Sequence, residues 1–343
     1  MKALVLEAYN RLVYRDVEEP QPASGEVLIN VKACGICGSD VHGLDGSTGR
    51  RQTPLIMGHE ASGIIVKVGA EVSCWKVGDR VTFDSTVYPL DDWYTLKGRY
   101  NLSEGREVIG VSPKEYKRHG AFAEYLAVPQ HILYKIPDNV NYEQAAIVEP
   151  AAVAAHAVRI SGINVGDSAI VFGSGMIGAF IVRLLKVAGA TTVIAVDIDD
   201  EKLKMAVKFG ADVAINSSRQ SVVDIVRSYT KGRGADVGFE AVGISATVNA
   251  LIDSLRKGAT AVLVGNITPI IDFPLQKTVT SELCIKGSCA ICGEYETVLD
   301  MIANGSLKVD GMISAVAPLS EGAEWFRKLY QKEGNFNKVI LVP

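Results

Sequence analysis

The amino-acid sequence predicts an α/β protein in which an irregular, strand-rich segment precedes a parallel β-sheet connected by helices. Residues 1 to about 150 contain short apolar runs such as ALVLEAY and ASGIIVKVG, separated by Gly, Pro, Asn and Asp. Short runs bounded by these residues are typical of strands joined by turns. From Ser168 onward, apolar strand-like runs alternate with segments of helical periodicity. This alternation predicts a doubly wound parallel sheet.

Each element of the alternating region has its own signal. The expected strands are short runs rich in Val, Ile and Ala, as in strands that are buried on both faces. The expected helices are longer and place apolar residues three or four positions apart. The strands are predicted at 168–173, 191–199, 211–216, 235–243 and 260–266, and the helices at 176–190, 201–211, 222–230 and 247–258.

The length of 343 residues predicts two domains, because a single hydrophobic core usually divides beyond about 250–300 residues. The alternating pattern assigns one domain to residues 155–285. The C-terminal segment, 286–343, has a predicted helix at 294–305 and ends in the strand-like KVILVP. Because this segment is too short to form a core by itself, we expect it to complete the domain formed by residues 1–154.

Composition excludes several classes of protein. Hydrophobic residues make up 48% and charged residues 22% of the chain, which indicates a folded globular protein. The net charge of -4, without a basic stripe, argues against nucleic acid as a partner. No secretory signal is expected, because the N-terminal MKALVLEAYNRLVY lacks a charged region followed by an apolar one. No membrane span is expected, because the longest apolar run, 148–158, is short and interrupted by Glu149 and His156. Six cysteines are too few for a disulfide scaffold, so we expect a cytoplasmic protein.

A glycine-rich turn predicts a dinucleotide site. Gly173-Ser-Gly175-Met176-Ile177-Gly178 follows an apolar strand and opens a helix. The three glycines allow a tight turn, close approach of the backbone to a pyrophosphate, and packing of the helix on the sheet. Backbone N–H groups at the start of the helix would then face the phosphates. Without this context the pattern would indicate only a tight turn.

The next strand ends in Asp197. At this position a carboxylate can accept hydrogen bonds from the hydroxyls of the adenosine ribose. Asp197, Asp199, Asp200 and Glu201 form an acidic run with no arginine, so a 2′-phosphate would meet like charge and NAD is favoured over NADP. Lys202 follows this run and is a candidate for contact with the ribose or a phosphate.

Thiol, imidazole and carboxylate residues suggest a metal site. In VKACGICGSDVH, Cys37 precedes Ser39, Asp40 and His42, and Gly-His59-Glu60 follows about twenty residues later. These residue types are zinc ligands, and a catalytic zinc needs three of them with one open position. Cys37 and His59 are the first two candidates. The third is Glu60 or Glu149, an acid in an otherwise apolar run that needs a compensating partner.

Other interpretations of these residues remain open. Cys37 alone would often be a small core residue, and with Cys34 it forms a CxxC that redox proteins and zinc knuckles also contain. The isolated histidines and the second CxxC are interpreted as core, surface or packing residues; they are His119, His131, His156, Cys289 and Cys292.

The sequence as a whole resembles the zinc-containing alcohol dehydrogenase family. GHEASGIIVKVGAEV, GDRV, AFAEYLAVP, LYKIPDNV, IVEP, GSGMIG and FEAVG occur in that family's order. GICGSDVH and the EP dipeptide are similar to the sorbitol or polyol dehydrogenase branch, including galactitol-1-phosphate 5-dehydrogenase-like proteins. The resemblance implies a GroES-like catalytic domain, a Rossmann domain, catalytic zinc, and hydride transfer between a polyol-type secondary alcohol and NAD to give a ketose. It also implies a homodimer or homotetramer.

The resemblance further implies roles for single residues. Cys37 and His59 become zinc ligands, with Glu60 and Glu149 sharing or exchanging the remaining coordination. Ser39 and His42 become a proton relay. Four residues would line the nicotinamide; they are Val242, Gly243, Val264 and Gly265.

The sequence departs from most of these relatives at a second, structural zinc site. The positions that match its four cysteines are Pro89, Asp92, Thr95 and Ser103. Thiolate coordination is impossible there, so we expect one zinc per subunit and a segment held by packing, hydrogen bonds or a subunit interface. Animal sorbitol dehydrogenases resemble this chain in that respect.

The substrate is less well defined than the chemistry. Sugar alcohols are favoured, and Arg50 and Arg51 could bind a phosphate, although a solvated basic loop is the simpler interpretation. L-Threonine and butanediol dehydrogenases are alternatives, as is a zinc-free quinone or enone reductase. A non-catalytic NAD-binding crystallin or sensor is the alternative outside enzymology.

Overall fold

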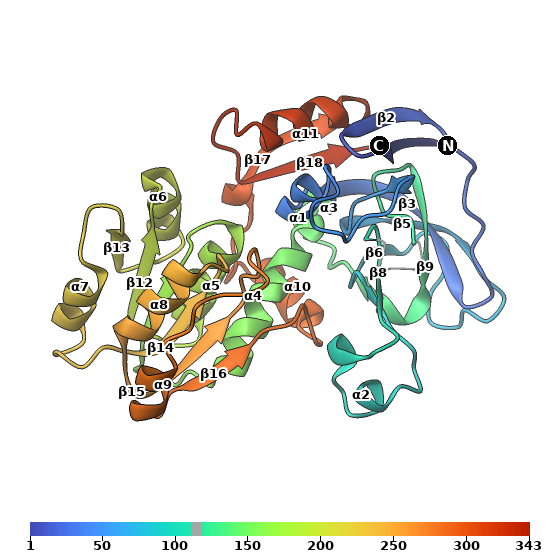
Figure 1. Ribbon diagram of the computed structural model, residues 1–343. Helices are drawn as coiled ribbons and strands as arrows, with labels where there is room; N and C mark the ends of the chain where they lie inside the picture. Colours follow the sequence, from blue (N-terminus) through green and yellow to red (C-terminus); the bar gives the residue numbers. More distant parts are fainter. Residues whose placement is uncertain (112–117) are drawn as a thin grey trace. The chain divides into compact units, whose positions relative to one another are not determined.

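The structure is a computed structural model that describes residues 1–111 and 118–343. The chain forms two compact units, one of residues 1–150 with 291–343 and the other of residues 151–290. The first unit is rich in strands and the second alternates strands with helices (Figure 1). The predicted α/β fold class is confirmed.

The first unit is built around a seven-stranded sheet with strand order β10-β6-β5-β3-β18-β17, in which β9 also pairs with β3. C-terminal strand β18 pairs antiparallel with β3, with Ile340 opposite Gly35 and Leu341 opposite Cys34. Segments from the two ends of the chain therefore share one sheet. The strands are β3 (Glu26–Gly35), β5 (Glu60–Val68), β6 (Arg80–Phe83), β9 (Tyr125–Pro129), β10 (Leu133–Lys135), β17 (Ile313–Pro318) and β18 (Lys338–Val342).

Smaller elements complete the first unit. They are β1 (Lys2–Ala8), β2 (Arg11–Asp16) and β4 (Leu55–Ile56) in a three-stranded sheet, β7 (Thr86–Val87) paired with β8 (Glu107–Val108), and helices α1 (Gly38–His42), α2 (Trp93–Leu96), α3 (Tyr142–Ala146), α10 (Tyr295–Ala303) and α11 (Gly322–Tyr330). Helix α4 (Val148–Ser161) begins in this unit and continues into the second.

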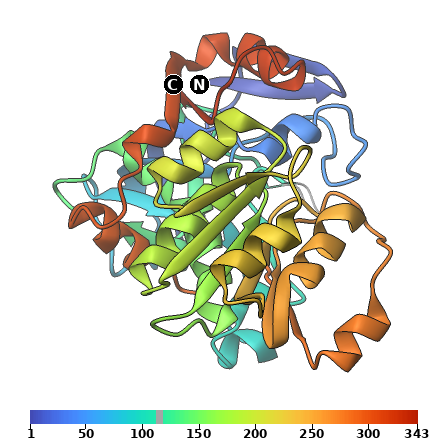
Figure 2. The ribbon, with the colours of Figure 1, turned by 90° about the vertical axis from the view of Figure 1, so that its left-hand side faces the viewer.

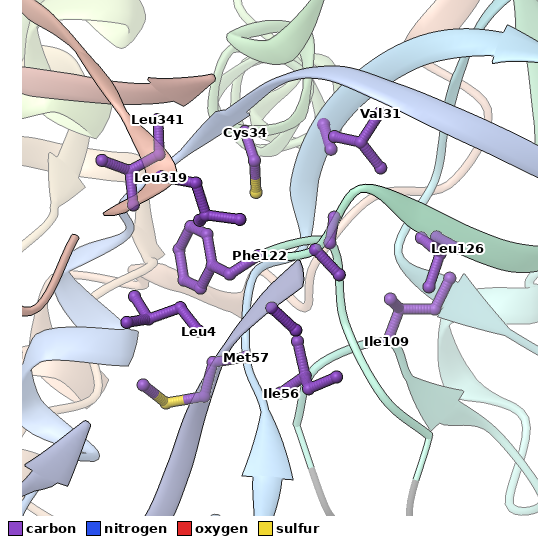
Figure 3. Close-up of a cluster of buried hydrophobic side chains, with 14 of the residues drawn as sticks. Leu4, Val31, Cys34, Ile56, Met57, Ile109, Phe122, Leu126, Leu319 and Leu341 are labelled. Atoms are coloured by element: carbon purple, nitrogen blue, oxygen red, sulfur yellow. The ribbon is translucent and has the colours of Figure 1, made fainter. Parts of the chain in front are cut away.

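The core of the first unit gathers side chains from both ends of the chain. Phe122 lies beside Leu4 and Leu319 (Figure 3), and its ring meets that of Phe326 edge to face. The Cys34 side chain belongs to this buried cluster and is fully buried. Cys34 and Cys37 are both free, so Cys34 is a core residue and this CxxC is not a disulfide.

The second unit contains a six-stranded sheet of order β13-β12-β11-β14-β15-β16 in which every pairing is parallel. Figure 2 shows these strands side by side with helices packed against them. The strands are β11 (Ser168–Phe172), β12 (Thr192–Asp197), β13 (Val213–Asn216), β14 (Ala235–Glu240), β15 (Leu255–Leu263) and β16 (Cys284–Gly287). The helices are α5 (Met176–Val187), α6 (Asp200–Lys208), α7 (Val222–Tyr229), α8 (Ser245–Ser254) and α9 (Leu275–Thr280).

The strand order of this sheet reverses between β11 and β14. Chain order runs outward from β11 through β12 to β13 on one side and from β14 through β15 to β16 on the other. In open parallel sheets, ligands bind beyond the carboxyl ends of the strands at such a switch point. A ligand is therefore expected to bind beside the residues that follow β11 and β14.

Three predicted helices end earlier than expected, α5 at Val187, α6 at Lys208 and α8 at Ser254. The sequence predicts a helix over 247–258, but α8 ends at Ser254 and β15 begins at Leu255, which pairs with Ala235 of β14. Strand pairing thus overrides the local helical pattern. No helix in the described residues is long and apolar enough to span a membrane.

Candidate functional site

Three potential metal ligands meet where the end of β3 lies beside the start of β5. Cys37 follows β3 as the N-cap of α1, His59 immediately precedes β5, and Glu60 begins it. In the antiparallel register Gly35, the last residue of β3, lies opposite Glu60. The Cys37 sulfur, a His59 nitrogen and a Glu60 oxygen all lie within 4.8 Å of one another. The structure thus brings together three of the predicted ligand residues.

A buried carboxylate, Asp40, lies next to His59. Its Oδ1 accepts a 2.9 Å hydrogen bond from Nη2 of Arg51 and lies 3.4 Å from Nδ1 of His59, a charge contact that falls short of hydrogen-bond geometry. Burial disfavours ionisation of Asp40, but the charges of His59 and Arg51 outweigh burial and lower its pKa to about 2. Because Asp40 occupies the Nδ1 side of the imidazole, Nε2 is the nitrogen that can bind a metal ion.

Glu60 has one bound oxygen and one free oxygen. Nζ of Lys338 donates a 2.5 Å hydrogen bond to Oε2 of Glu60 and a 3.0 Å hydrogen bond to the carbonyl oxygen of Ile36. Oε1 of Glu60 is buried and has no hydrogen-bond partner among the described residues. A buried carboxylate oxygen without a partner is costly. Beside a thiol and an imidazole, this oxygen fits the ligand set that zinc prefers.

Glu149 lies in the first turn of α4, outside the group of ligand atoms that share the 4.8 Å limit. Burial raises the pKa of this carboxyl, the charge of His59 opposes the rise, and the charge of Glu60 adds to it. Because both charges affect Glu149, it lies near the three-residue group without belonging to it.

Ser39 and His42, the predicted proton relay, are both exposed on α1. Oγ of Ser39 donates a 3.3 Å hydrogen bond to Sγ of Cys37 and accepts one of 3.5 Å from Nη2 of Arg51. The serine hydroxyl is therefore held beside the candidate metal site.

Arg51 is not available as a phosphate ligand. Its side chain is only 1% exposed and pairs with Asp40, which is fully buried. A buried guanidinium needs such a counter-charge, so the hypothesis that Arg50 and Arg51 bind a phosphate together is wrong. Arg50 itself is exposed.

Hydrogen bonds and stacking hold the segment from Pro89 to Ser103. The Asp92 carboxylate caps α2 by accepting two of its backbone N–H groups. The Tyr100 ring stacks on Tyr88 at a centroid distance of 4.3 Å, and its hydroxyl donates a 2.8 Å hydrogen bond to Asp84. The same hydroxyl accepts a 2.8 Å hydrogen bond from the backbone of Gly293. These contacts bind the segment to the rest of the first unit.

In the second unit, the glycine-rich turn connects β11 to α5 at the switch point. Gly173 has a φ of +88°, and a Cβ on Gly178 would lie 1.7 Å from the carbonyl oxygen of Gly173. A Cβ on Gly175 would meet no atom within 4 Å. The fold itself therefore requires the first and third glycines, whereas the open space at Gly175 suits the approach of a ligand. Met176 and Ile177 begin α5, so their backbone N–H groups lie at its N-terminus.

Asp197 lies beside this turn at the end of β12. Its Oδ2 accepts a 2.7 Å hydrogen bond from the backbone of Ser174, and its Oδ1 accepts from the two residues that follow it. Lys202 is exposed on α6. The acidic run contains no arginine of its own, but Arg219 forms an ion pair with Asp200. Arg219 follows β13, the neighbouring strand, and only the fold brings it here.

The four residues expected to line the nicotinamide form two adjoining turns, after β14 and β15. A Cβ on Gly265 would lie 2.3 Å from the backbone nitrogen of Gly243. The side chain of Val242 also lies close to Gly173, whose Cβ would be 2.7 Å from Cγ2 of Val242. The structure therefore groups Val242, Gly243 and Gly265 around the glycine-rich turn.

Sequence reasoning did not assign roles to Asp40 or Lys338. Asp40 carries a local signal, since it occupies the third position of α1 and accepts a hydrogen bond from the Cys37 backbone. Lys338 carries only a weak signal, a lysine that opens the apolar strand KVILV. Its role depends on the pairing of β18 with β3.

A thiol–imidazole–carboxylate group in one unit and a glycine turn at the switch point of the other define a metal- and dinucleotide-dependent oxidoreductase. Residues 23–138 match the alcohol dehydrogenase GroES-like domain, and residues 177–304 match the zinc-binding dehydrogenase family.

Known proteins resemble the chain along its length. D-xylulose reductase A of Aspergillus oryzae is 33% identical over 341 residues, which are 97% of this chain and 94% of that protein. The structure of galactitol-1-phosphate dehydrogenase from Escherichia coli superimposes with a TM-score of 0.93 at 26% identity, covering 100% of both chains. A zinc-binding dehydrogenase from Sinorhizobium meliloti bound to NADP has a TM-score of 0.92 at 31% identity, covering 100% of this chain and 99% of its own. The chain belongs to the zinc-dependent medium-chain alcohol dehydrogenases, in the branch that contains the polyol dehydrogenases.

Proposed function

We propose that this protein transfers a hydride between a polyol-type secondary alcohol and NAD, giving the ketose. The observation that carries the proposal is the group of Cys37, His59 and Glu60, in which one buried carboxylate oxygen has no partner. Similarity to a protein named D-xylulose reductase and to galactitol-1-phosphate dehydrogenase supports a polyol or its phosphate as the substrate.

Cys37, His59 and Glu60 are the residues that would hold the zinc ion, and Glu149, whose pKa responds to the charges of His59 and Glu60, is the candidate to exchange with one of them. When bound there, zinc supplies Lewis acidity toward the substrate oxygen. We expect one zinc per subunit, because the segment from Pro89 to Ser103 contains no cysteine. The hydrogen bonds that hold this segment support the same conclusion.

The chain's own residues handle the proton. The Ser39 hydroxyl lies 3.3 Å from the Cys37 sulfur, and Ser39 is exposed to solvent. We assign Ser39 to accept the proton of the substrate hydroxyl while it gives its own hydroxyl proton to His42, and His42 to release a proton to water. Asp40 orients His59, and Lys338 orients Glu60.

We propose NAD as the preferred cofactor. The Asp197 carboxylate lies beside the glycine-rich turn, where it would accept hydrogen bonds from ribose hydroxyls and repel a 2′-phosphate. The pairing of Arg219 with Asp200 leaves that arginine partly neutralised. The relative bound to NADP makes NADP the alternative, which separate titrations with NADH and NADPH would distinguish.

We also propose that the protein is a cytoplasmic homodimer or homotetramer. Disulfide scaffolds are typical of oxidising compartments, and six cysteines in 343 residues are too few for such a scaffold. Analytical ultracentrifugation of the purified protein tests the subunit number.

The decisive experiment is a screen of zinc-loaded protein with NAD and NADP on sorbitol, xylitol, galactitol, galactitol 1-phosphate, 2,3-butanediol and L-threonine. Turnover of a polyol that requires zinc supports the proposal. Turnover of L-threonine or 2,3-butanediol alone would overturn the substrate class. Binding of NADH without turnover of any alcohol would favour a non-catalytic dinucleotide-binding protein instead.

A further inference from the structure

Glu240 is a buried acid at the switch point whose role neither the sequence motifs nor the proposed mechanism explains. It is the last residue of β14 and is fully buried. Its Oε1 accepts hydrogen bonds from the backbone of Val242 (2.9 Å), the backbone of Gly243 (2.9 Å) and the hydroxyl of Thr247 (2.7 Å). Oε2 also accepts from Gly243, at 2.9 Å. The side chain therefore fixes the turn after β14.

The main chain of Glu240 holds the neighbouring turn. Its carbonyl oxygen accepts hydrogen bonds of 2.8 Å from the backbone of Val264 and 2.9 Å from that of Gly265. One residue thus ties together the turns that follow β14 and β15. These turns contain all four residues expected to line the nicotinamide.

The two turns have little room to move independently. Gly243 has a φ of +91°, and a Cβ there would lie 2.4 Å from the backbone nitrogen of Asn266. Because the backbones are in direct contact, a shift in the turn at Val242 would move the turn at Gly265.

We propose that Glu240 is a positioning residue that sets the shape of the nicotinamide-binding wall through both turns. The inference rests on the proposed function, since it assumes that a dinucleotide binds to this unit. A carboxylate that accepts only neutral N–H and O–H donors orients them more strongly than a neutral acceptor does. Gln is nearly isosteric, but its amide group would turn an N–H toward a backbone N–H that now donates to the carboxylate.

The test compares Glu240→Gln with wild type in binding NADH and ADP-ribose, which lacks the nicotinamide, by calorimetry. We expect the Kd for NADH to rise about tenfold, which corresponds to one charge-assisted hydrogen bond of roughly 1.4 kcal/mol. The Kd for ADP-ribose should change less than about twofold, because ADP-ribose has no group for this wall. If Glu240 only stabilised the fold, its substitution would weaken the binding of NADH and of ADP-ribose equally.

Asp236→Asn is the matched control. Asp236 is the second residue of β14, and its carboxylate accepts hydrogen bonds from the backbone of Ser168 and from Nε of Arg256. It should leave the ratio of the two Kd values unchanged. If Glu240→Gln does not fold, Thr247→Val removes one of the same hydrogen bonds and should raise the Kd for NADH by about threefold.

If Glu240→Gln and Thr247→Val both bind NADH as wild type does, or if binding of NADH and ADP-ribose is weakened equally, this inference is overturned while the proposed function stands. Wild-type protein that binds neither NADH nor NADPH would overturn the proposed function and this inference with it.

Discussion

Replacing Arg51 with Met should strongly destabilise the first unit. The Arg51 guanidinium lies 2.9 Å from Oδ1 of Asp40, and the two side chains are 1% and 0% exposed. Without Arg51, the buried Asp40 carboxylate would keep the backbone N–H of Cys37 and, as its charged neighbour, His59 at 3.4 Å. Removing one partner of a buried ion pair costs about 3–5 kcal/mol. Because His59 still compensates part of the charge, we expect a loss of about 3 kcal/mol.

Tryptophan fluorescence during urea unfolding measures this loss. The three tryptophans, Trp75, Trp93 and Trp325, all belong to the first unit, so the signal reports on that unit. The matched control is Arg50→Met, which removes the neighbouring but exposed guanidinium and should change stability by less than about 0.5 kcal/mol.

A double-mutant cycle isolates the pair. Asp40→Asn added to Arg51→Met removes the uncompensated charge, so the double variant should be more stable than the sum of the single effects predicts, by about 2 kcal/mol. An Arg51→Met protein as stable as wild type, or strictly additive effects, would refute the reasoning. If that variant instead kept its stability and lost affinity only for phosphorylated polyols, Arg51 would be a phosphate ligand after all.

Three further predictions concern other parts of the molecule. Burial raises the pKa of Asp84 to about 6 from an ordinary 3.8, so its contribution to stability is greatest below pH 4 and is lost as the pH rises through 6. Asp84→Asn should therefore remove about 3 kcal/mol from the change in unfolding free energy between pH 4 and 7, measured by urea unfolding. In this variant the Tyr100 hydroxyl would accept a hydrogen bond from the Asn amide. An unchanged pH profile would contradict this prediction. Cys37→Ala should lower zinc affinity at least ~100-fold and abolish turnover, with the Kd for NADH within about twofold; equal loss of zinc and NADH binding would argue against separate sites. Asp197→Ala should raise the Kd for NADH about tenfold and reduce the preference for NADH over NADPH, which titrations with both cofactors would measure. An unchanged ratio of the two Kd values would show that Asp197 does not select the cofactor.

The sequence predicted five of the six strands of the parallel sheet, because each of these five contains an apolar run between turn residues. β11, for example, is buried along its whole length. The sixth, β16, has the sequence CIKG and was not predicted. The end of α8 was predicted less well, since the residues after Ser254 have helical periodicity but pair with β14 instead. Local pattern decides such a segment only where no neighbouring strand competes for it.

The residues of the candidate metal site were found from chemical type, but their supporting charges were not. Cys37 and His59 occur in short motifs that a reader can recognise, whereas Lys338 lies 278 positions from the Glu60 it contacts. No spacing rule connects residues that far apart. Only the pairing of β18 with β3 brings them together.

Arg51 illustrates a different limit, because it is only 11 positions from its partner Asp40. An arginine pair in a loop with Gly and Ser has the composition of a solvated surface, and one of the two is indeed exposed. Which guanidinium enters the interior depends on the carboxylate already buried beside His59. A buried charge requires a partner. An acid next to a candidate metal ligand, such as Asp40, therefore indicates that a nearby arginine or lysine pairs with that acid and does not bind the substrate.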